Sequence, residues 1–251
     1  MPALPQSFLT RPIAHRGLHD LANGIPENSL AAAAAAIAAG YPIELDVQPS
    51  KDGVAMVFHD EEMARLTGRE GLVTDYTAAE LGQIPLTGGS EPVPTLAAFL
   101  AFVAGRVPLL IEIKAQDVYD GTNSTALVAE VARVLDGYDG DVAIMSFNPF
   151  AILAAKEAIP DRPRGLTTWG WDELPESALP DSVLAPMIAI DAYGAAECCF
   201  ISHHDRDLPR ARVAELKSSG AAILCWTIRS PAQEAIAREI ADNITFEAYR
   251  A

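Results

Sequence analysis

Short apolar runs alternate with segments of helical periodicity along most of the chain. A run of about four to eight apolar residues predicts a buried strand, and an apolar repeat of three to four residues behind a capping side chain predicts a helix. The predicted strands are Pro12–Ala14, Ile43–Val47, Val54–Phe58, Pro108–Lys114, Val142–Ser146, Gly165–Thr168, Cys199–Ser202, Ala221–Ile228 and Asn243–Phe246. The predicted helices are Leu30–Ala39, Thr77–Gly82, Leu96–Ala104, Ser124–Leu135, Pro149–Ile159, Val213–Ser219 and Pro231–Ala241, with Asn28 or Ser29 as the N-cap of the first. Strands that alternate with helices form parallel sheets, so this pattern predicts an α/β fold of the TIM (β/α)8 barrel type.

Two regions depart from this alternation. Residues 60–94 are rich in turn residues and predict a small loop-rich insertion after the second strand. In the region Leu174–Ala196 the periodicity is weak, and the sixth barrel strand is either Met187–Ile190 or Cys199–Ser202. We favour Cys199–Ser202 because a predicted helix, Val213–Ser219, follows it.

The strand Ile43–Val47 carries two acids among apolar residues. Glu44 and Asp46 alternate with the apolar positions, so both carboxylates point to one face. Like charges on one face repel, and a bound divalent cation is the commonest way to offset that cost. The same alternation also fits the solvated face of an edge strand.

The segment after this strand predicts a hairpin. A turn at Lys51–Gly53 precedes Val54–Phe58, which would return alongside the acidic strand and end at His59. A metal site and an acid/base group would then be neighbours, although His59 and Asp60 also fit an ordinary turn at a strand end.

Composition bounds the domain count, the partners and the compartment. A chain of 251 residues, half of them hydrophobic, can bury one sizeable core, so we expect a single domain over residues 1–251. The formal net charge of −16 argues against nucleic-acid binding and against docking on an anionic membrane. Cys198, Cys199 and Cys225 lack disulfide or zinc-site spacing, which predicts buried thiols in a reducing compartment. With neither a signal peptide nor a bilayer-length apolar run, we expect a cytoplasmic protein with no stable membrane association.

Polar residues gather where predicted strands end. The active site of a TIM barrel is built from the C-terminal ends of its strands and the loops that follow them. The polar residues at or near such positions are His15, Arg16, Glu44, Asp46, His59, Glu112 and Lys114. Their shared location predicts one site at the barrel mouth.

These residues lie in motifs that together resemble the glycerophosphodiester phosphodiesterase family. The matching segments are His15–Gly17, Pro26–Ser29, Glu44–Val47, Lys51–Gly53, Phe58–Asp60, Ile111–Lys114, Ser146–Phe147 and Trp226–Thr227, with Arg65, Thr67–Gly68, Gly71–Val73, Asp75–Thr77, Glu80–Leu81 and Pro94–Leu96 in and after the insertion. The match is dense in the first half and sparse beyond Ser146. Any one segment is common, but their order and spacing are specific.

The resemblance implies a TIM barrel whose inserted segment 60–94 helps to cover the substrate. It implies one divalent cation, Mg²⁺ or Ca²⁺, held by Glu44, Asp46 and Glu112 with Glu27 as a further ligand. It further implies that His15 and His59 are the catalytic acid/base pair and that Arg16 and Lys114 contact the phosphate. The implied substrates are small glycerophosphodiesters, such as glycerophosphocholine or glycerophosphoethanolamine, converted to glycerol 3-phosphate and an alcohol.

The chemistry of these side chains agrees with the implied roles. Carboxylates suit a hard cation that can bridge to a phosphoryl oxygen. An arginine grips a phosphate as a planar fork and a lysine adds a point charge. One histidine would protonate the leaving alkoxide while the other removes a proton from the nucleophile, which is either water or the substrate's own hydroxyl.

Structural roles compete with each functional one. Arg16 and Lys114 could be ion-pair partners of surplus acids, and Glu27 at a helix start also favours the helix dipole. Trp169 and Trp226 could form an apolar wall beside the alcohol group, or only pack in the core.

The end of the chain departs from the family pattern. The family's last strand usually ends in Thr-Asp followed by Pro, whereas this chain has Thr245, Phe246 and Glu247 and stops at Ala251. The eighth helix is therefore nearly absent, which puts barrel closure in question and suggests an apolar flank that a second copy could cover, giving a homo-oligomer.

Two alternative functions differ in the features they require. A related phosphodiesterase acting on lysophospholipids or another phosphodiester would need an apolar ridge near the mouth, and the loop 86–94 shows no obvious one. A binding protein without turnover would be favoured by loss of either catalytic histidine, and both are present.

Overall fold

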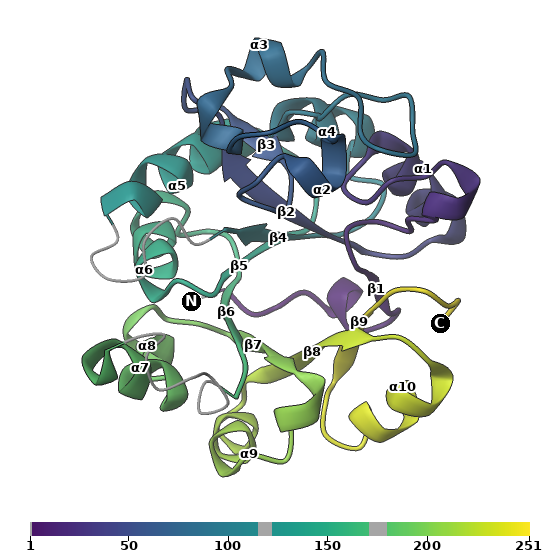
Figure 1. The fold of residues 1–251 in the computed structure, drawn as a ribbon. Helices are drawn as coiled ribbons and strands as arrows, with labels where there is room; N and C mark the ends of the chain where they lie inside the picture. The colour runs from purple at the N-terminus through teal and green to yellow at the C-terminus, as the bar shows by residue number, and fades with distance from the viewer. Residues whose placement is uncertain (1, 115–121, 171–179) are drawn as a thin grey trace.

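The chain folds into a closed parallel barrel in the computed structural model, which describes residues 2–114, 122–170 and 180–251. Eight strands form the barrel in the order β1–β2–β4–β5–β6–β7–β8–β9, and β1 pairs with both β9 and β2 to close it. Their bounds are β1 Ile13–Ala14, β2 Ile43–Pro49, β4 Leu109–Ile113, β5 Val142–Ser146, β6 Arg164–Thr168, β7 Phe200–His204, β8 Ala222–Ile228 and β9 Asn243–Phe246. Figure 1 looks along this barrel and shows helices around its outside. The predicted TIM barrel is confirmed.

The helices outside the insertion are α1 Leu30–Ala39, α4 Leu96–Val103, α5 Thr122–Leu135, α6 Pro149–Ala158, α7 Asp181–Ile188, α8 Ala192–Ala195, α9 Ala211–Ser218 and α10 Pro231–Ala237. Every one of them but α7 and α8 was predicted from the sequence; these two lie in the region 174–196, where the periodicity is weak. Ser29 caps α1, since its hydroxyl accepts a hydrogen bond from the backbone nitrogen of Ala32. The other expected cap, Asn28, instead has a positive φ of 56° and turns its side chain toward β2. No helix in the described ranges is both long enough and apolar enough to cross a membrane.

The sixth barrel strand is the favoured one of the two alternatives. It is β7, Phe200–His204, whereas residues 187 and 188 belong to α7. All three cysteines are buried and unpaired, as expected. Cys198 precedes β7 and packs in the outer core, which fills the space between the barrel and its helices.

The barrel is closed at its last strand, contrary to the question that the sequence raised. The strand β9 pairs with β1 on one side and β8 on the other. Tyr249 packs edge-on against Phe246, with 5.5 Å between ring centroids, and its hydroxyl donates to Glu234 over 2.8 Å. These contacts hold the short tail against the barrel.

An apolar plug fills the end of the barrel opposite the site. The N-terminal segment crosses there (purple in Figure 1), and its Phe8 is fully buried. It packs in one cluster with Ile13, Leu110, Phe200 and Leu224 from the surrounding strands. This end of the barrel interior is thus filled mainly by apolar side chains.

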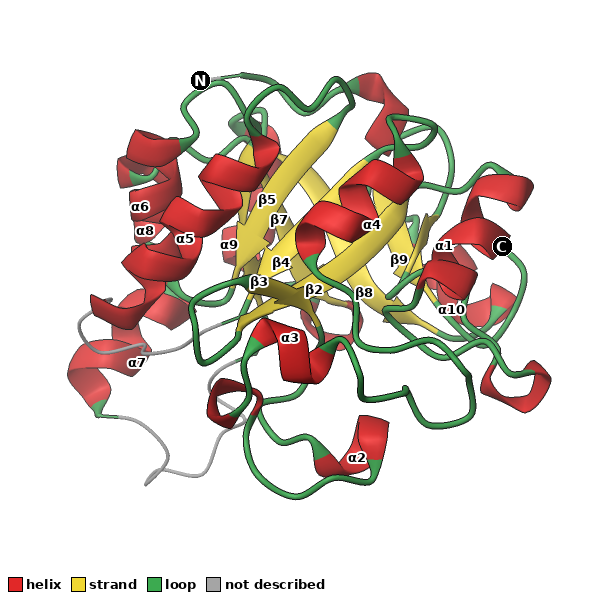
Figure 2. Cartoon of the chain, turned by 90° about the horizontal axis from the view of Figure 1, so that it is seen from above, coloured by secondary structure: helices red, strands yellow, loops and turns green. Residues whose placement is uncertain are grey.

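The insertion has a small core of its own. It contains α2 Ala64–Thr67 and α3 Ala78–Leu81 and follows the short strand β3 Ala55–Val57, which pairs antiparallel to β2 as the predicted hairpin requires. Met63, Leu66 and Leu81 pack against Met56 and Phe58 at this hairpin. Figure 2 shows α2 and α3 beyond one end of the barrel strands. The insertion is therefore anchored to the acidic strand through β3.

A glycine in β6 makes room for the plug. A Cβ atom at Gly165 would lie 2.4 Å from the Phe200 ring and 2.6 Å from its carbonyl oxygen. We expect Gly165→Ala to lower the free energy of unfolding by about 1 to 3 kcal/mol, because the core must shift to accept the methyl group. Gly194→Ala in α8, where nothing lies within 4 Å of the added atom, is the matched control and should be neutral or stabilising. Urea unfolding of both variants measures this, and equal stability of the two would contradict it.

Candidate active site

Two buried carboxylates on β2 form the centre of the site. The strand's apolar residues pack outward against the helices, and Glu44 and Asp46 point inward, each only 2% exposed. The interpretation of these acids as the solvated face of an edge strand is therefore wrong, because β2 lies inside the barrel wall between β1 and β4.

A third carboxylate comes from the neighbouring strand. Glu112 on β4 is in register with Asp46 and is 6% exposed. One oxygen of each acid, Glu44, Asp46 and Glu112, lies within 4.8 Å of the others. We call these three residues the acidic trio. Three converging carboxylate oxygens are a donor set for a hard divalent cation such as Mg²⁺ or Ca²⁺.

Two cationic side chains flank the acidic trio. The Lys114 ammonium lies 2.7 Å from Glu112 Oε1 and 3.4 Å from Asp46 Oδ1. Arg16 lies on the other side, with Nε 3.5 Å from Asp46 Oδ2. Its backbone nitrogen donates to Glu44 Oε2 over 2.9 Å. The two predicted phosphate contacts therefore lie beside the predicted metal ligands.

The loop after β1 is shaped to place Arg16. This residue has a positive φ of 54°, which is strained for a side chain of its size. Gly17 follows with φ 79°, and a Cβ there would lie 2.8 Å from that of Ala32 in α1. Only glycine allows the loop to pack this closely while the Arg16 backbone turns toward Glu44.

Burial and charge shift the pKa values of Glu44 and Asp46 in opposite directions. Burial, with the charges of Asp46 and Glu112, raises the pKa of Glu44 well above its ordinary value. Burial also acts to raise the pKa of Asp46, but the charges of Lys114, His59 and Arg16 outweigh it and hold that pKa below its usual range. The pKa of Lys114 is raised, because its acidic neighbours outweigh its burial. The site thus keeps Asp46 ionised and leaves Glu44 electrostatically strained.

Each predicted catalytic histidine is held by a carboxylate. His15 Nδ1 lies 2.5 Å from Glu247 Oε2, and His59 Nδ1 lies 2.6 Å from Asp60 Oδ1. An ionised carboxylate only accepts hydrogen bonds, so Nδ1 carries the proton and each neutral ring presents Nε2 as its basic atom. His15 Nε2 lies 3.9 Å from Glu44 Oε2, at the acidic trio.

Glu27 lies between two arginines. Its oxygens accept from Arg16 over 2.6 Å and from Arg65 of the insertion over 2.8 and 3.0 Å. Although burial acts to raise the pKa of Glu27, the two guanidinium groups lower it. Glu27 is not part of the acidic trio, so its role as a fourth metal ligand remains a prediction.

Aromatic rings line the adjoining part of the mouth. Trp226 on β8 lies edge-on to Phe147, with 5.4 Å between centroids, and 5.0 Å from the ring of His204. His204 also lies 6.5 Å from Trp169. The two tryptophans predicted as a substrate wall are therefore part of one ring cluster, made of Phe147, Trp169, His204 and Trp226.

Comparison with known proteins agrees with this geometry. Residues 15–243 match the model of the glycerophosphoryl diester phosphodiesterase family. The chain belongs to this family. The members described next are phosphodiesterases by name, so the expected family is confirmed.

Named relatives span most of the chain. A glycerophosphodiester phosphodiesterase of Caldanaerobacter subterraneus subsp. tengcongensis is 34% identical over 61% of this chain and 65% of its own length, just under two thirds. The putative glycerophosphodiester phosphodiesterase YhdW of Bacillus subtilis is 28% identical over 87% of this chain and 86% of its own. An Oleispira antarctica phosphodiesterase, solved with its product sn-glycerol-3-phosphate, superposes with a TM-score of 0.76 at 26% identity over 96% of this chain and 94% of that one.

Three residues of the site were missed from the sequence. Asn28 donates to Asp46 Oδ2 over 2.9 Å and is buried, but the sequence indicated only a helix cap. Asp60 was noted as part of a turn and of the matching segment Phe58–Asp60, but was given no role of its own. Glu247 was noted as a departure from the family pattern, although a carboxylate at the end of the last strand of a barrel could have been expected at the mouth.

The strain at Glu44 gives a stability prediction for this family member. A raised pKa in the folded state means that Glu44 favours folding at low pH and costs stability once pH rises through that pKa. In metal-free solution at neutral pH we expect Glu44→Gln, which keeps an acceptor for the Arg16 backbone, to stabilise the protein by about 1 to 3 kcal/mol. Mg²⁺ or Ca²⁺ should raise the melting temperature of the wild type more than that of the variant.

The control is Glu239→Gln on the exposed side of the molecule, which should change stability by less than about 0.5 kcal/mol. Thermal unfolding with chelator and with each cation measures all three proteins. A Glu44→Gln variant that is less stable than the wild type in chelator would contradict the electrostatic account.

Proposed function

We propose that the protein hydrolyses small glycerophosphodiesters to glycerol 3-phosphate and an alcohol, with one divalent cation. The observation that carries this proposal is the acidic trio between two cationic side chains, with a carboxylate-held histidine at its edge. Family membership and the named phosphodiesterases similar to this chain support the same reaction.

Each group at the site has a part in this proposal. Glu44, Asp46 and Glu112 would hold Mg²⁺ or Ca²⁺, with Glu27 as a further ligand. When bound, the cation supplies a Lewis acid that offsets charge on the phosphoryl oxygens. Once the acids are neutralised in this way, Arg16 and Lys114 can direct their donors to the phosphate.

His15 and His59 supply the proton transfers. Burial lowers the pKa of His15 despite the opposing effect of Glu247, so His15 is neutral at pH 7 and suited to accept a proton at Nε2. His59, held at Nδ1 by Asp60, would act in its doubly protonated form and donate the Nε2 proton to the leaving alkoxide. A carboxylate behind each ring stabilises the protonated form that each histidine passes through.

The surrounding segments have supporting roles in the proposal. The insertion 60–94 would cover the bound substrate, because Arg65 ties it to Glu27 at the mouth. The ring cluster with Trp169 and Trp226 would face the alcohol group. We place the protein in the cytoplasm, since its buried, unpaired cysteines suit a reducing compartment.

The direct test is release of glycerol 3-phosphate from glycerophosphocholine and glycerophosphoethanolamine, with Mg²⁺, with Ca²⁺ and with chelator. We expect metal-dependent release, and we expect His59→Ala to lower kcat by about 10²- to 10⁴-fold because one proton transfer is lost. Glu44→Ala should lose metal-dependent activity, while Glu239→Ala on the surface should match the wild type. If the wild-type protein is inactive on both substrates with either cation, the proposed glycerophosphodiester hydrolysis is wrong. Lysophospholipids would then be tested as substrates.

The contact between Glu247 and His15 predicts a change in the pH profile. Glu247 favours protonated His15, so Glu247→Gln should lower the pKa of His15 further. We expect the acidic limb of kcat/KM to move to lower pH and kcat to fall at least about tenfold, since an amide can also hold the wrong tautomer. Activity measured from pH 5 to 9 decides this. An acidic limb that stays in place or moves to higher pH would mean that Glu247 does not act on a catalytic His15.

A further inference from the structure

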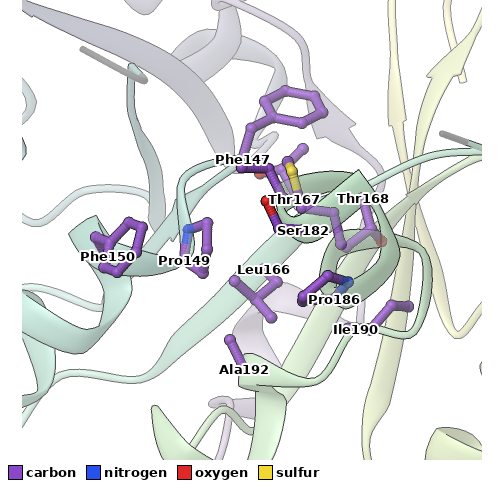
Figure 3. A pocket seen from close by; sticks show the side chains of 12 residues that line it. Phe147, Pro149, Phe150, Leu166, Thr167, Thr168, Ser182, Pro186, Ile190 and Ala192 are labelled. Atoms are coloured by element: carbon purple, nitrogen blue, oxygen red, sulfur yellow. The ribbon is translucent and has the colours of Figure 1, made fainter. Parts of the chain in front are cut away.

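A cavity of about 160 Å³ lies beside the barrel mouth, between the ends of β5 and β6 and the helices α7 and α8. Phe147 borders it, and Leu166, Pro186, Ile190 and Ala192 are among its apolar lining residues (Figure 3). Val183 of α7 also lines it. A cavity of about this size lined by apolar side chains can hold a benzene-sized group.

The chemistry of the lining selects an uncharged occupant. Every described residue that lines the cavity is apolar or carries a hydroxyl, and none of them is ionisable. Lys114 lies 6.0 Å from the centroid of the Phe147 ring and is not among the lining residues. An ammonium group in this cavity would lose its hydration without gaining a carboxylate partner among the described lining residues.

The two threonines at the edge of the cavity add no unpaired hydroxyl to it. Thr168 engages its hydroxyl with His203 Nδ1 over 2.7 Å. Thr167 lies between Leu166 and Thr168 on β6, so its side chain points to the opposite face of the strand, into the barrel interior, in register with Ser202 of β7. The face that the cavity offers to an occupant is therefore largely apolar.

Phe147 connects this cavity to the proposed active site. Its ring lies over Lys114, which is 2.7 Å from Glu112 of the acidic trio. The same ring touches Trp226 of the ring cluster. A phosphodiester bound at the acidic trio would therefore have a substituent of moderate length within reach of the cavity.

We propose that this cavity binds an uncharged aryl or short alkyl group on the alcohol part of the phosphodiester substrate. The proposal rests on the proposed function and adds a substrate class to it. The glycerol part carries two hydroxyls that an apolar cavity would leave largely unpaired, so the alcohol part is the one that enters. In the net reaction, the bond from phosphorus to the alcohol oxygen breaks and one water molecule is consumed: its hydroxyl goes to phosphorus and its proton to the alcohol oxygen.

The test compares two substrates in the intact protein with Mg²⁺: the benzyl ester of glycerol 3-phosphate and glycerophosphoethanolamine. We expect kcat/KM to favour the benzyl ester by about ten- to a hundredfold, from burial of the ring. Val183→Phe, which fills the cavity, should abolish this preference and leave turnover of glycerophosphoethanolamine unchanged. Ala185→Phe, on an exposed position of the same helix outside the cavity lining, is the matched control and should keep the preference.

Ala192→Leu is a second, smaller filling substitution from the other side of the cavity, and it should reduce the preference if Val183→Phe fails to fold. Hydrolysis of both substrates with no preference, or a preference that survives both filling variants, overturns the cavity proposal and leaves the proposed function intact. If neither substrate is hydrolysed, the proposed function fails, and calorimetry with benzyl alcohol then decides the cavity alone. Binding to the wild type and to Ala185→Phe but not to Val183→Phe would support the cavity, and no binding to the wild type would overturn it.

Discussion

Repulsion among three buried carboxylates is the constraint on which the site depends. Glu44, Asp46 and Glu112 converge inside a barrel whose opposite end is apolar, so few water molecules can screen them. Lys114 and Arg16 offset part of this charge, and Asn28 donates a hydrogen bond to Asp46. Three free carboxylates in water would move apart, but here the strands β2 and β4 of the barrel wall hold them together. The fold thus stores an electrostatic cost that a divalent cation can relieve.

The carboxylates around this centre act through the groups they hold. Glu247 and Asp60 fix the two histidines at Nδ1, and Glu27 joins Arg16 to Arg65. Negative and positive side chains therefore follow one another outward from the acidic trio, through Arg16 and Glu27 to Arg65. The insertion is tied to the barrel by the ion pair between Arg65 and Glu27 as well as by its apolar contacts with β3, so the position of the cover depends on the electrostatics of the site.

The features that could be predicted from the sequence are those that a local pattern of residues determines. Alternation of acids with apolar residues on β2 indicated which face Glu44 and Asp46 occupy, and alternating strands and helices indicated that strand ends would meet at one mouth. The partners of the histidines depend instead on contacts across the fold. Glu247 reaches His15 from the other end of the chain, a separation of 232 residues, which no local pattern encodes. Asn28 was read as a helix cap because asparagine suits that position equally well, and only its positive φ turns it to Asp46. The cavity beside Phe147 arises from side chains of four separate elements and has no signature in the sequence.

The most direct test of this account is a crystal structure with Mn²⁺ and glycerol 3-phosphate, recorded with the anomalous signal of manganese. The account predicts one ion bound by Glu44, Asp46 and Glu112, with the phosphate in contact with Arg16 and Lys114 and with His15 Nε2 facing it. An ion held elsewhere, or a phosphate bound away from the acidic trio, would contradict the claim that relief of this buried repulsion is what the site uses to act on a phosphodiester.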